Sequence, residues 1–323
     1  MVQFCIVAFL TLGWPEKTKE LDYFYPTNTL VTGYDIIFFW VARMIMAGYE
    51  YKGDMPFKNV YFTGIVRDKL GRKMSKSLGN SPDPLELIDK YGADPVRFYM
   101  MTNSEPWDNL KFDPNGVDET RRKFFGTLYN TYSFFALYAN VDGFDAEAAQ
   151  VPFEKRPEID RWILSSLNTL IKGVDRELAG YDPTRAGRLI DAFVNDDLSN
   201  WYVRLNRKRF WGKEMSEDKL SAYQTLYTCL MTVAKLLAPF APFYADELYH
   251  DLGGELESVH LDKFPVADEA AIDADLEERM AIARRLLLWY WHCAVKSISK
   301  CASRCSVSWF RWWTKSRKCI SKP

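Results

Sequence analysis

Hydrophobic residues recur at three- and four-residue steps along four segments in the second half of the chain, which is the spacing of amphipathic helices. The four segments cover residues 124–135, 159–178, 189–205 and 217–237. Pro239 follows the last segment, at a place where a proline ends a helix. Because each helix must bury its apolar stripe against the others, this half of the chain is predicted to form a helix bundle.

The pattern is different before residue 100. Residues 28–33 and 59–66 are short β-branched and aromatic runs of strand length, and residues 35–48 between them have helical spacing. This succession predicts a β-α-β unit with two parallel strands. Asp83 followed by Pro84 predicts the start of a further helix. The expected fold class is therefore an α/β segment, part of a Rossmann-like nucleotide-binding fold, followed by an all-α bundle.

The composition suits two folded domains and changes sharply near the end. The chain has 323 residues, of which 48% are hydrophobic, and a net charge of -1. After Arg285 there are eight Lys or Arg and no acidic residue. Four of the six cysteines also lie there, in no zinc-binding spacing, so we predict no metal site and a reducing, cytoplasmic location. No apolar run approaches the roughly 20 residues of a membrane span.

The ten residues 71–80, which we call the lysine loop, have the composition of an anion-binding loop. Lys73 and Lys76 supply ammonium groups, and Ser75 and Ser77 supply hydroxyls, between glycines at both ends. The loop follows the second predicted strand, and parallel sheets bind ligands at the carboxyl ends of their strands. The loop is therefore predicted to bind a polyphosphate. The alternative is a solvated basic turn.

Two further groups of residues are candidates for binding. Gly33 and Asp35 lie at the end of the first predicted strand, where the carboxylate can accept hydrogen bonds from ribose hydroxyls or simply cap the next helix. Residues 199–211 interleave basic and aromatic side chains in a pattern that suits RNA backbone and unstacked bases. A solvated helix face is the alternative for this run. Its basic residues, the candidate RNA contacts, are Arg204, Arg207, Lys208 and Arg209.

Several motifs resemble class I aminoacyl-tRNA synthetases. Lys-Met-Ser-Lys-Ser at 73–77 resembles the signature loop of this class, and Thr-Gly-Tyr-Asp-Ile-Ile-Phe-Phe-Trp-Val-Ala-Arg-Met at 32–44 is similar to valyl enzymes. Residues 101–285 resemble the anticodon-binding helical domain of isoleucyl enzymes, most specifically at Pro-Trp-Asp-Asn-Leu-Lys-Phe-Asp, 106–113. The segment at 89–94 is shared between the two kinds of enzyme. The expected domains are residues 11–118, the carboxyl half of a catalytic domain, and residues 119–285, an anticodon-binding domain.

The resemblance implies an ATP-dependent ligase that joins isoleucine or valine to its tRNA, with Mg²⁺, as a monomer. Lys73 and Lys76 would be catalytic, because they stabilise charge on the triphosphate while the amino acid carboxylate attacks the α-phosphorus. Trp40 would wall the amino acid pocket, or else be a core tryptophan. The implied ATP-binding residues are Gly33, Asp35, Lys73, Met74, Ser75, Lys76 and Ser77.

One motif of the family is not in this sequence. Class I synthetases pair the lysine loop with His-x-Gly-His, and none of the three histidines here lies in such a motif. The first half of the nucleotide fold and the editing domain are not recognisable either. This chain alone is therefore expected to form little aminoacyl-adenylate. The alternative function is a non-catalytic tRNA-binding module, built on the bundle, in which the lysine loop is vestigial.

The sequence also indicates a chimera with altered ends. Residues 11–94 look valyl and residues 98–285 look isoleucyl. Reverse translation of both ends in a shifted frame gives strings similar to what the family carries at those places. We therefore expect residues 1–10 and 286–323 to be frameshifted peptide. The alternative for the basic, aromatic tail is a segment that binds RNA or an anionic membrane.

Overall fold

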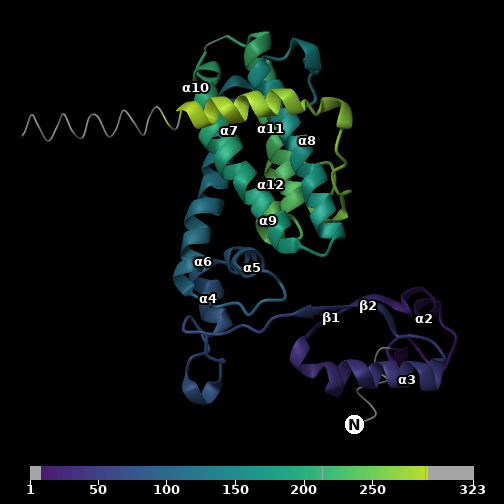
Figure 1. Ribbon diagram of the computed structural model, residues 1–323. Helices are drawn as coiled ribbons and strands as arrows, with labels where there is room; N and C mark the ends of the chain where they lie inside the picture. Colours follow the sequence, from purple (N-terminus) through teal and green to yellow (C-terminus); the bar gives the residue numbers. More distant parts are fainter. Residues whose placement is uncertain (1–8, 213, 288, 290–323) are drawn as a thin grey trace, which may run out of the picture.

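The computed structural model describes residues 9–212, 214–287 and 289 (Figure 1). Two structural units are apparent: a small unit with two strands, which we call the strand lobe (residues 9–63), and a helix bundle (residues 121–287). The intervening residues 64–120 carry the lysine loop and three helices. The predicted fold class, an α/β segment followed by helices, is confirmed. Most of the two predicted frameshifted segments lies outside the described residues.

The strand lobe is the β-α-β unit that the hydrophobic pattern predicts. Strands β1 (Thr27–Gly33) and β2 (Phe57–Thr63) pair in parallel, with Gly33 opposite Thr63 at their carboxyl ends. The chain between them forms a single turn of 3-10 helix, a π-helical segment (Ile37–Val41) and then α3 (Ala42–Lys52). The lobe begins with the short helix α2 (Lys19–Phe24). Strand β2 ends three residues earlier than predicted, because the Gly64 amide bonds to the Pro106 carbonyl instead.

Three helices connect the two units, and one of them belongs to two hydrophobic cores. They are α4 (Pro84–Tyr91), α5 (Ala93–Thr102) and α6 (Pro114–Thr120). Asp83 caps α4 as predicted, with its carboxylate accepting from the Leu85 amide at 2.8 Å. On α5, Phe98 packs into the core of the bundle, whereas Tyr99 packs into a smaller cluster with Leu110. Helix α5 therefore ties residues 64–120 to the bundle.

The four predicted helical stripes all form helices of the bundle. The third stripe is a continuous helical run of α9, a π-helical segment (Phe193–Val203) and α10. Ser216, which directly precedes the fourth predicted segment, caps its helix, α11. A further helix, α12, follows Pro239 and was not predicted. The bundle helices are α7 (Gly126–Asp142), α8 (Glu158–Ala179), α9 (Pro183–Ala192), α10 (Arg204–Phe210), α11 (Glu217–Leu237) and α12 (Pro242–Asp251).

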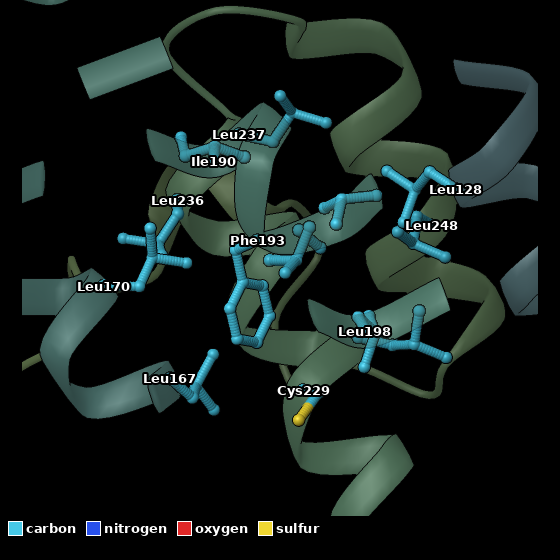
Figure 2. Close-up of a cluster of buried hydrophobic side chains, with 14 of the residues drawn as sticks. Leu128, Leu167, Leu170, Ile190, Phe193, Leu198, Cys229, Leu236, Leu237 and Leu248 are labelled. Carbon is cyan, nitrogen blue, oxygen red and sulfur yellow. The ribbon is translucent and has the colours of Figure 1, made fainter. Parts of the chain in front are cut away.

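The core of the bundle is made by the apolar stripes that the sequence displays. Figure 2 shows Leu167 and Leu170 of α8, Ile190 of α9 and Leu237 of α11 gathered around Phe193. Cys229 lies in the same core, fully buried, and burial raises the pKa of its thiol. None of the helices in the described part of the chain is long and apolar enough to cross a bilayer.

The beginning of α12 is capped by a residue of α5. Asp94 accepts a hydrogen bond from the Tyr244 amide at 2.6 Å, and Arg97 donates to the carbonyls of Pro239 and Phe240. Asp94 thereby supplies the carboxylate that the first turn of a helix favours. Burial raises the pKa of Asp94, although the helix amides lower it.

The strand lobe contacts the bundle through the turn between α8 and α9. Tyr181 in this turn has a φ of 59°, the left-handed conformation that costs a non-glycine residue energy. Its carbonyl accepts from the Tyr61 hydroxyl of β2 at 2.8 Å, and its own hydroxyl lies 2.9 Å from Thr29 Oγ1 of β1. The strained residue therefore bonds both strands of the lobe.

Candidate nucleotide and RNA sites

The lysine loop follows a pair of hydrogen-bonded segments, which we call the base of the loop. Residues 64–67 run beside residues 106–112 and exchange main-chain hydrogen bonds with them. The Arg67 amide donates to Leu110, and the Phe112 amide donates back to Arg67, at 2.8 and 2.9 Å. The motif at 106–113, which resembles the isoleucyl enzymes, therefore pairs with the segment that leads into the lysine loop.

Gly64 is expected to tolerate no side chain at this base. A Cβ atom there would lie 1.9 Å from the carbonyl oxygen of Asp108, so the two segments would have to separate. We expect Gly64→Ala to destabilise the protein by roughly 1–3 kcal/mol, the usual cost of overpacking. Urea unfolding measures the loss. The control is Gly126→Ala, because the nearest atom to a Cβ at Gly126 is the Arg121 carbonyl oxygen, at 3.6 Å. Gly53 is unsuitable as a control because its φ of 70° would strain an alanine. Equal effects of Gly64→Ala and Gly126→Ala would contradict the tight approach.

Two left-handed glycines bound the loop. Gly71 has a φ of 80° and Gly79 a φ of 59°, and an added Cβ would find open space or ordinary contact at both. Their conformation, and not a close approach, therefore requires glycine. Between them the chain makes a single turn of 3-10 helix at Lys76–Leu78. Met74, predicted to contact ATP, packs its side chain against the small apolar cluster around Tyr99.

The polar side chains of the loop lie at different depths. Lys73 is exposed, and within the described part of the chain its ammonium group forms no ion pair. The side chain of Lys76, the second predicted cation, lies outside what the structure describes. The hydroxyls of Ser75 and Ser77 lie 3.0 Å apart, and Ser75 Oγ also accepts from the Leu78 amide at 3.2 Å. The loop thus presents an uncompensated positive charge.

Two residues that hold the loop were not among the predicted site residues. Asp68 precedes the loop and Asn80 ends it, and their side chains are hydrogen-bonded at 3.1 Å. The sequence signal was weak, since a single Asp and a single Asn 12 positions apart occur in many loops. Next to them, a cavity of about 440 Å³ separates the outer part of the loop from residues 112–115.

The predicted nucleotide and amino acid residues lie at the carboxyl end of β1. Gly33 ends the strand beside Thr63, and Asp35 follows in an exposed turn of 3-10 helix. A Cβ atom on Gly33 would lie 2.8 Å from the Asp35 carboxylate, so the glycine leaves room for it. Trp40 is half-buried and packs against the apolar cluster of Val41, Met44 and Phe57. This packing is that of a core tryptophan, the alternative to a residue that walls the amino acid pocket.

Three of the four predicted RNA-binding residues lie on one exposed face. Arg204, Arg207 and Lys208 of α10 point to solvent, and none of them forms an ion pair with a described residue. Trp211, at the end of the helix, is 56% exposed. We call Arg204, Arg207, Lys208 and Trp211 the basic face. It combines positive charge with an aromatic surface on which a base can stack.

Arg209, the fourth predicted residue, is turned into the bundle. Its guanidinium binds Asp160 of α8 in a bidentate pair at 2.7 and 2.9 Å, and it also binds Asp218. Asp160 is fully buried and accepts further hydrogen bonds from Tyr202 and Ser221, at 2.8 and 2.6 Å. Burial, together with Asp160, raises the pKa of Tyr202 well above the ordinary value. Arg209 therefore joins α8, α10 and α11 in the structure.

Comparison with known families matches both units. Residues 5–113 match the family described as tRNA synthetases class I (I, L, M and V), and residues 160–290 match the anticodon-binding domain of tRNA ligases. The isoleucine-tRNA ligase of Porphyromonas gingivalis is 59% identical over 262 residues, which is 81% of this chain and 23% of that protein. The valine-tRNA ligase of Fusobacterium nucleatum is 44% identical over 273 residues, 84% of this chain and 30% of that protein.

Solved structures share the fold at low identity. A ternary complex of Agrobacterium radiobacter LeuRS with tRNA and LeuAMS aligns with a TM-score of 0.67 at 20% identity, covering 84% of this chain and 33% of that chain. A methionyl-tRNA synthetase of Mycobacterium tuberculosis in complex with methionyl-adenylate aligns with a TM-score of 0.61 at 22% identity, covering 74% and 47%.

The similarity to isoleucine-tRNA ligases runs through both units. An alignment of 262 residues is longer than either predicted segment, 11–94 or 98–285, so a single relative matches the chain across the predicted seam. The resemblance therefore does not require two sources. The chain spans about a quarter of the length of the curated relatives it matches. With a lysine loop that follows a parallel β-α-β unit, and a bundle that matches the anticodon-binding domain of tRNA ligases, the chain belongs to the class I aminoacyl-tRNA synthetases, of isoleucyl and valyl type.

Proposed function

We propose that this chain carries one half of the adenylation site and the anticodon-binding domain of an isoleucine-tRNA ligase. The observation that carries the proposal is the lysine loop, which presents an uncompensated cation and follows the second of two parallel strands in the chain. Isoleucine is favoured over valine because the isoleucine relatives are 49–59% identical and the valine relative is 44% identical. The protein acts as a cytoplasmic monomer.

The proposed reaction is the activation of an amino acid by ATP. The amino acid carboxylate attacks the α-phosphorus, pyrophosphate leaves, and Lys73 and Lys76 stabilise the charge on the departing phosphates. Asp35 accepts hydrogen bonds from the ribose, near Gly33, and Trp40 walls the amino acid side. Ser75 and Ser77 supply hydroxyls to the phosphates, and Met74 anchors the loop.

Magnesium would arrive with the nucleotide. Within the described residues, no three His, Cys, Asp or Glu side chains converge on a metal position. Mg²⁺ keeps most of its waters and is bound largely through substrate phosphates, so it needs no such cluster. When bound, it would neutralise charge on the triphosphate. The chain's own contribution is to place the lysine ammonium groups beside the same phosphates.

Removal of the Lys73 charge tests the nucleotide site. We expect Lys73→Ala to weaken ATP binding to the purified chain by roughly 10- to 100-fold, since a charge-assisted hydrogen bond is lost. Isothermal titration calorimetry measures the affinity. The matched control is Lys58→Ala, which removes an exposed lysine at the far end of β2. The same loss in both variants would contradict the proposal. ATP–pyrophosphate exchange by the chain alone is expected to be weak.

A non-catalytic tRNA-binding module is the second candidate function. It is favoured by the basic face, whose three cations lack partners among the described residues. Under this alternative, tRNA binding weakens steeply with salt, as expected when phosphates are neutralised, and ATP does not bind. A filter-binding titration of tRNA at several salt concentrations, with and without ATP, separates the two functions.

A further inference from the structure

The Asp68 carboxylate accepts hydrogen bonds from main-chain amides at the start of the lysine loop. Its Oδ1 accepts from the amides of Leu70 and Arg72, at 3.0 and 2.8 Å. Its Oδ2 accepts from Arg72 Nε at 2.8 Å and from Asn80 Nδ2 at 3.1 Å. Asp68 is only 7% exposed. All four hydrogen bonds therefore converge on one shielded group that precedes the loop.

Asn80 holds the opposite end of the loop to its middle. Its Nδ2 donates to the Lys73 carbonyl at 3.2 Å as well as to Asp68, and its Oδ1 accepts from the Ser75 amide at 2.9 Å. The side chain thus bonds the backbone on both sides of Met74. Because Lys73 is one of the two bonded residues, the direction in which its side chain leaves the backbone depends on Asn80.

Other contacts on this part of the loop are few: the backbone of Arg67 forms an antiparallel bridge with that of Lys73, and Arg67 Nη1 donates to the Gly71 carbonyl at 3.3 Å. The cavity of about 440 Å³ is lined by Asp68, Arg72, Met74 and Asn80 on the loop side, so the loop does not pack tightly on residues 112–115 there. The two left-handed glycines at its ends allow many backbone conformations. Met74 supplies the one apolar anchor. Hydrogen bonds to Asp68 and Asn80 therefore add to the bridge between Arg67 and Lys73 and restrict the backbone that follows it, as far as Ser75.

We propose that Asp68 and Asn80 are positioning residues that fix the main chain around Lys73 and so direct its ammonium group toward a bound triphosphate. The proposal rests on the proposed function. It assigns no chemical step to either residue, because both act through the loop backbone. Neither side chain belongs to the predicted set of ATP contacts.

The titration of Asp68 is consistent with this arrangement. Burial alone would raise its pKa, but the hydrogen bonds from Asn80 and from Arg72 outweigh burial and lower the pKa to about 2. A folded-state pKa below the unfolded value stabilises the ionised loop above about pH 4, and this stabilisation is lost as the pH falls toward 2. Carboxyl carbon NMR should find the pKa of Asp68 higher in Asn80→Ala.

Trypsin reports on the order of the loop, because Lys69, Arg72, Lys73 and Lys76 are cleavage sites. Asn80→Ala, which removes three hydrogen bonds, and Asp68→Asn, which removes the carboxylate, are each expected to speed cleavage between residues 69 and 77 by at least about tenfold. Both should weaken binding of inorganic tripolyphosphate by a similar factor. The matched control is Asn59→Ala, which removes a single hydrogen bond, from Asn59 to the Asn28 carbonyl, on the strand lobe.

An exchange of the two residues separates positioning from general disruption. In Asp68→Asn/Asn80→Asp, the new amide can donate to the new carboxylate, which can still accept from the Ser75 amide. The new carboxylate cannot donate to the Lys73 carbonyl as Asn80 does, so this double variant is expected to recover part of the slow cleavage and of the tripolyphosphate affinity. Thermal unfolding should change little in all variants, because the bundle is distant from the loop.

Two results would overturn the proposal. One is cleavage of both single variants at the wild-type rate. The other is faster cleavage with unchanged tripolyphosphate affinity, measured under conditions in which Lys73→Ala does lower that affinity. If the wild-type chain binds no tripolyphosphate, the proposed function fails in this chain and so does the direction of Lys73 toward it. The cleavage rates then still decide whether the two residues fix the loop.

Discussion

Asp160→Ala is expected to destabilise the protein by about 3–5 kcal/mol, the usual cost of removing one partner of a buried ion pair. The substitution leaves the Arg209 guanidinium, 15% exposed, without its bidentate acceptor. It also leaves the hydroxyls of Tyr202 and Ser221 without the carboxylate to which they donate. Urea unfolding followed by circular dichroism measures the loss in the free energy of unfolding.

Two variants show whether the buried pair causes this loss. Asp218→Ala removes the other carboxylate bound to Arg209. Because the Asp218 side chain is 54% exposed, we expect the free energy of unfolding to fall by at most about 1 kcal/mol. Asp160→Leu combined with Arg209→Met removes both charges and is expected to recover much of the stability. A loss from Asp218→Ala as large as that from Asp160→Ala would contradict the assignment.

Phe98→Ala is expected to lower the free energy of unfolding by about 3–5 kcal/mol. Phe98 of α5 is 2% exposed and stacks on Phe124, with their ring centroids 4.3 Å apart. Its ring also meets Phe125 and Phe240 edge-on, at 5.8 and 6.2 Å. Removing it leaves a cavity between α5 and the bundle. Calorimetry measures the change, and we expect the unfolding of residues 64–120 to separate from that of the bundle.

The control is a phenylalanine of the same region that does not fill the core. Phe243 at the start of α12 is 68% exposed, so Phe243→Ala should change the free energy of unfolding by less than about 1 kcal/mol. A small effect of Phe98→Ala would mean that α5 is held by Asp94 and Arg97 and not by its buried ring.

The elements with long, regular patterns could be predicted from the sequence. The stripes of α8 and α11 give their helices to within a residue or two, and Ser216 marks where α11 begins. Helix α12 was missed because it is short and lies between prolines and polar residues. Its first turn is capped by Asp94, a residue distant in the sequence, and no local pattern displays such a cap.

The site divides in the same way. The charge of the lysine loop and its place after β2 follow from composition and spacing alone. The role of Arg209 does not, because a basic residue on a helix looks the same whether it faces solvent or a buried carboxylate. The one signal was Asp160, which lies between Ile159 and Ile163 on an apolar stripe and so needs a partner. The Asp68–Asn80 hydrogen bond depends on a fold of the loop that no periodicity encodes.

The cap on α12 has a consequence for synthesis on the ribosome. Asp94 and Tyr244 are 150 residues apart. Because ribosomes add about 5–20 residues per second, Tyr244 is synthesised roughly 8–30 s after Asp94 of α5. During this interval the ring of Phe98 also lacks Phe240, which comes equally late in translation. A nascent chain halted before residue 240 therefore offers this aromatic surface to chaperones.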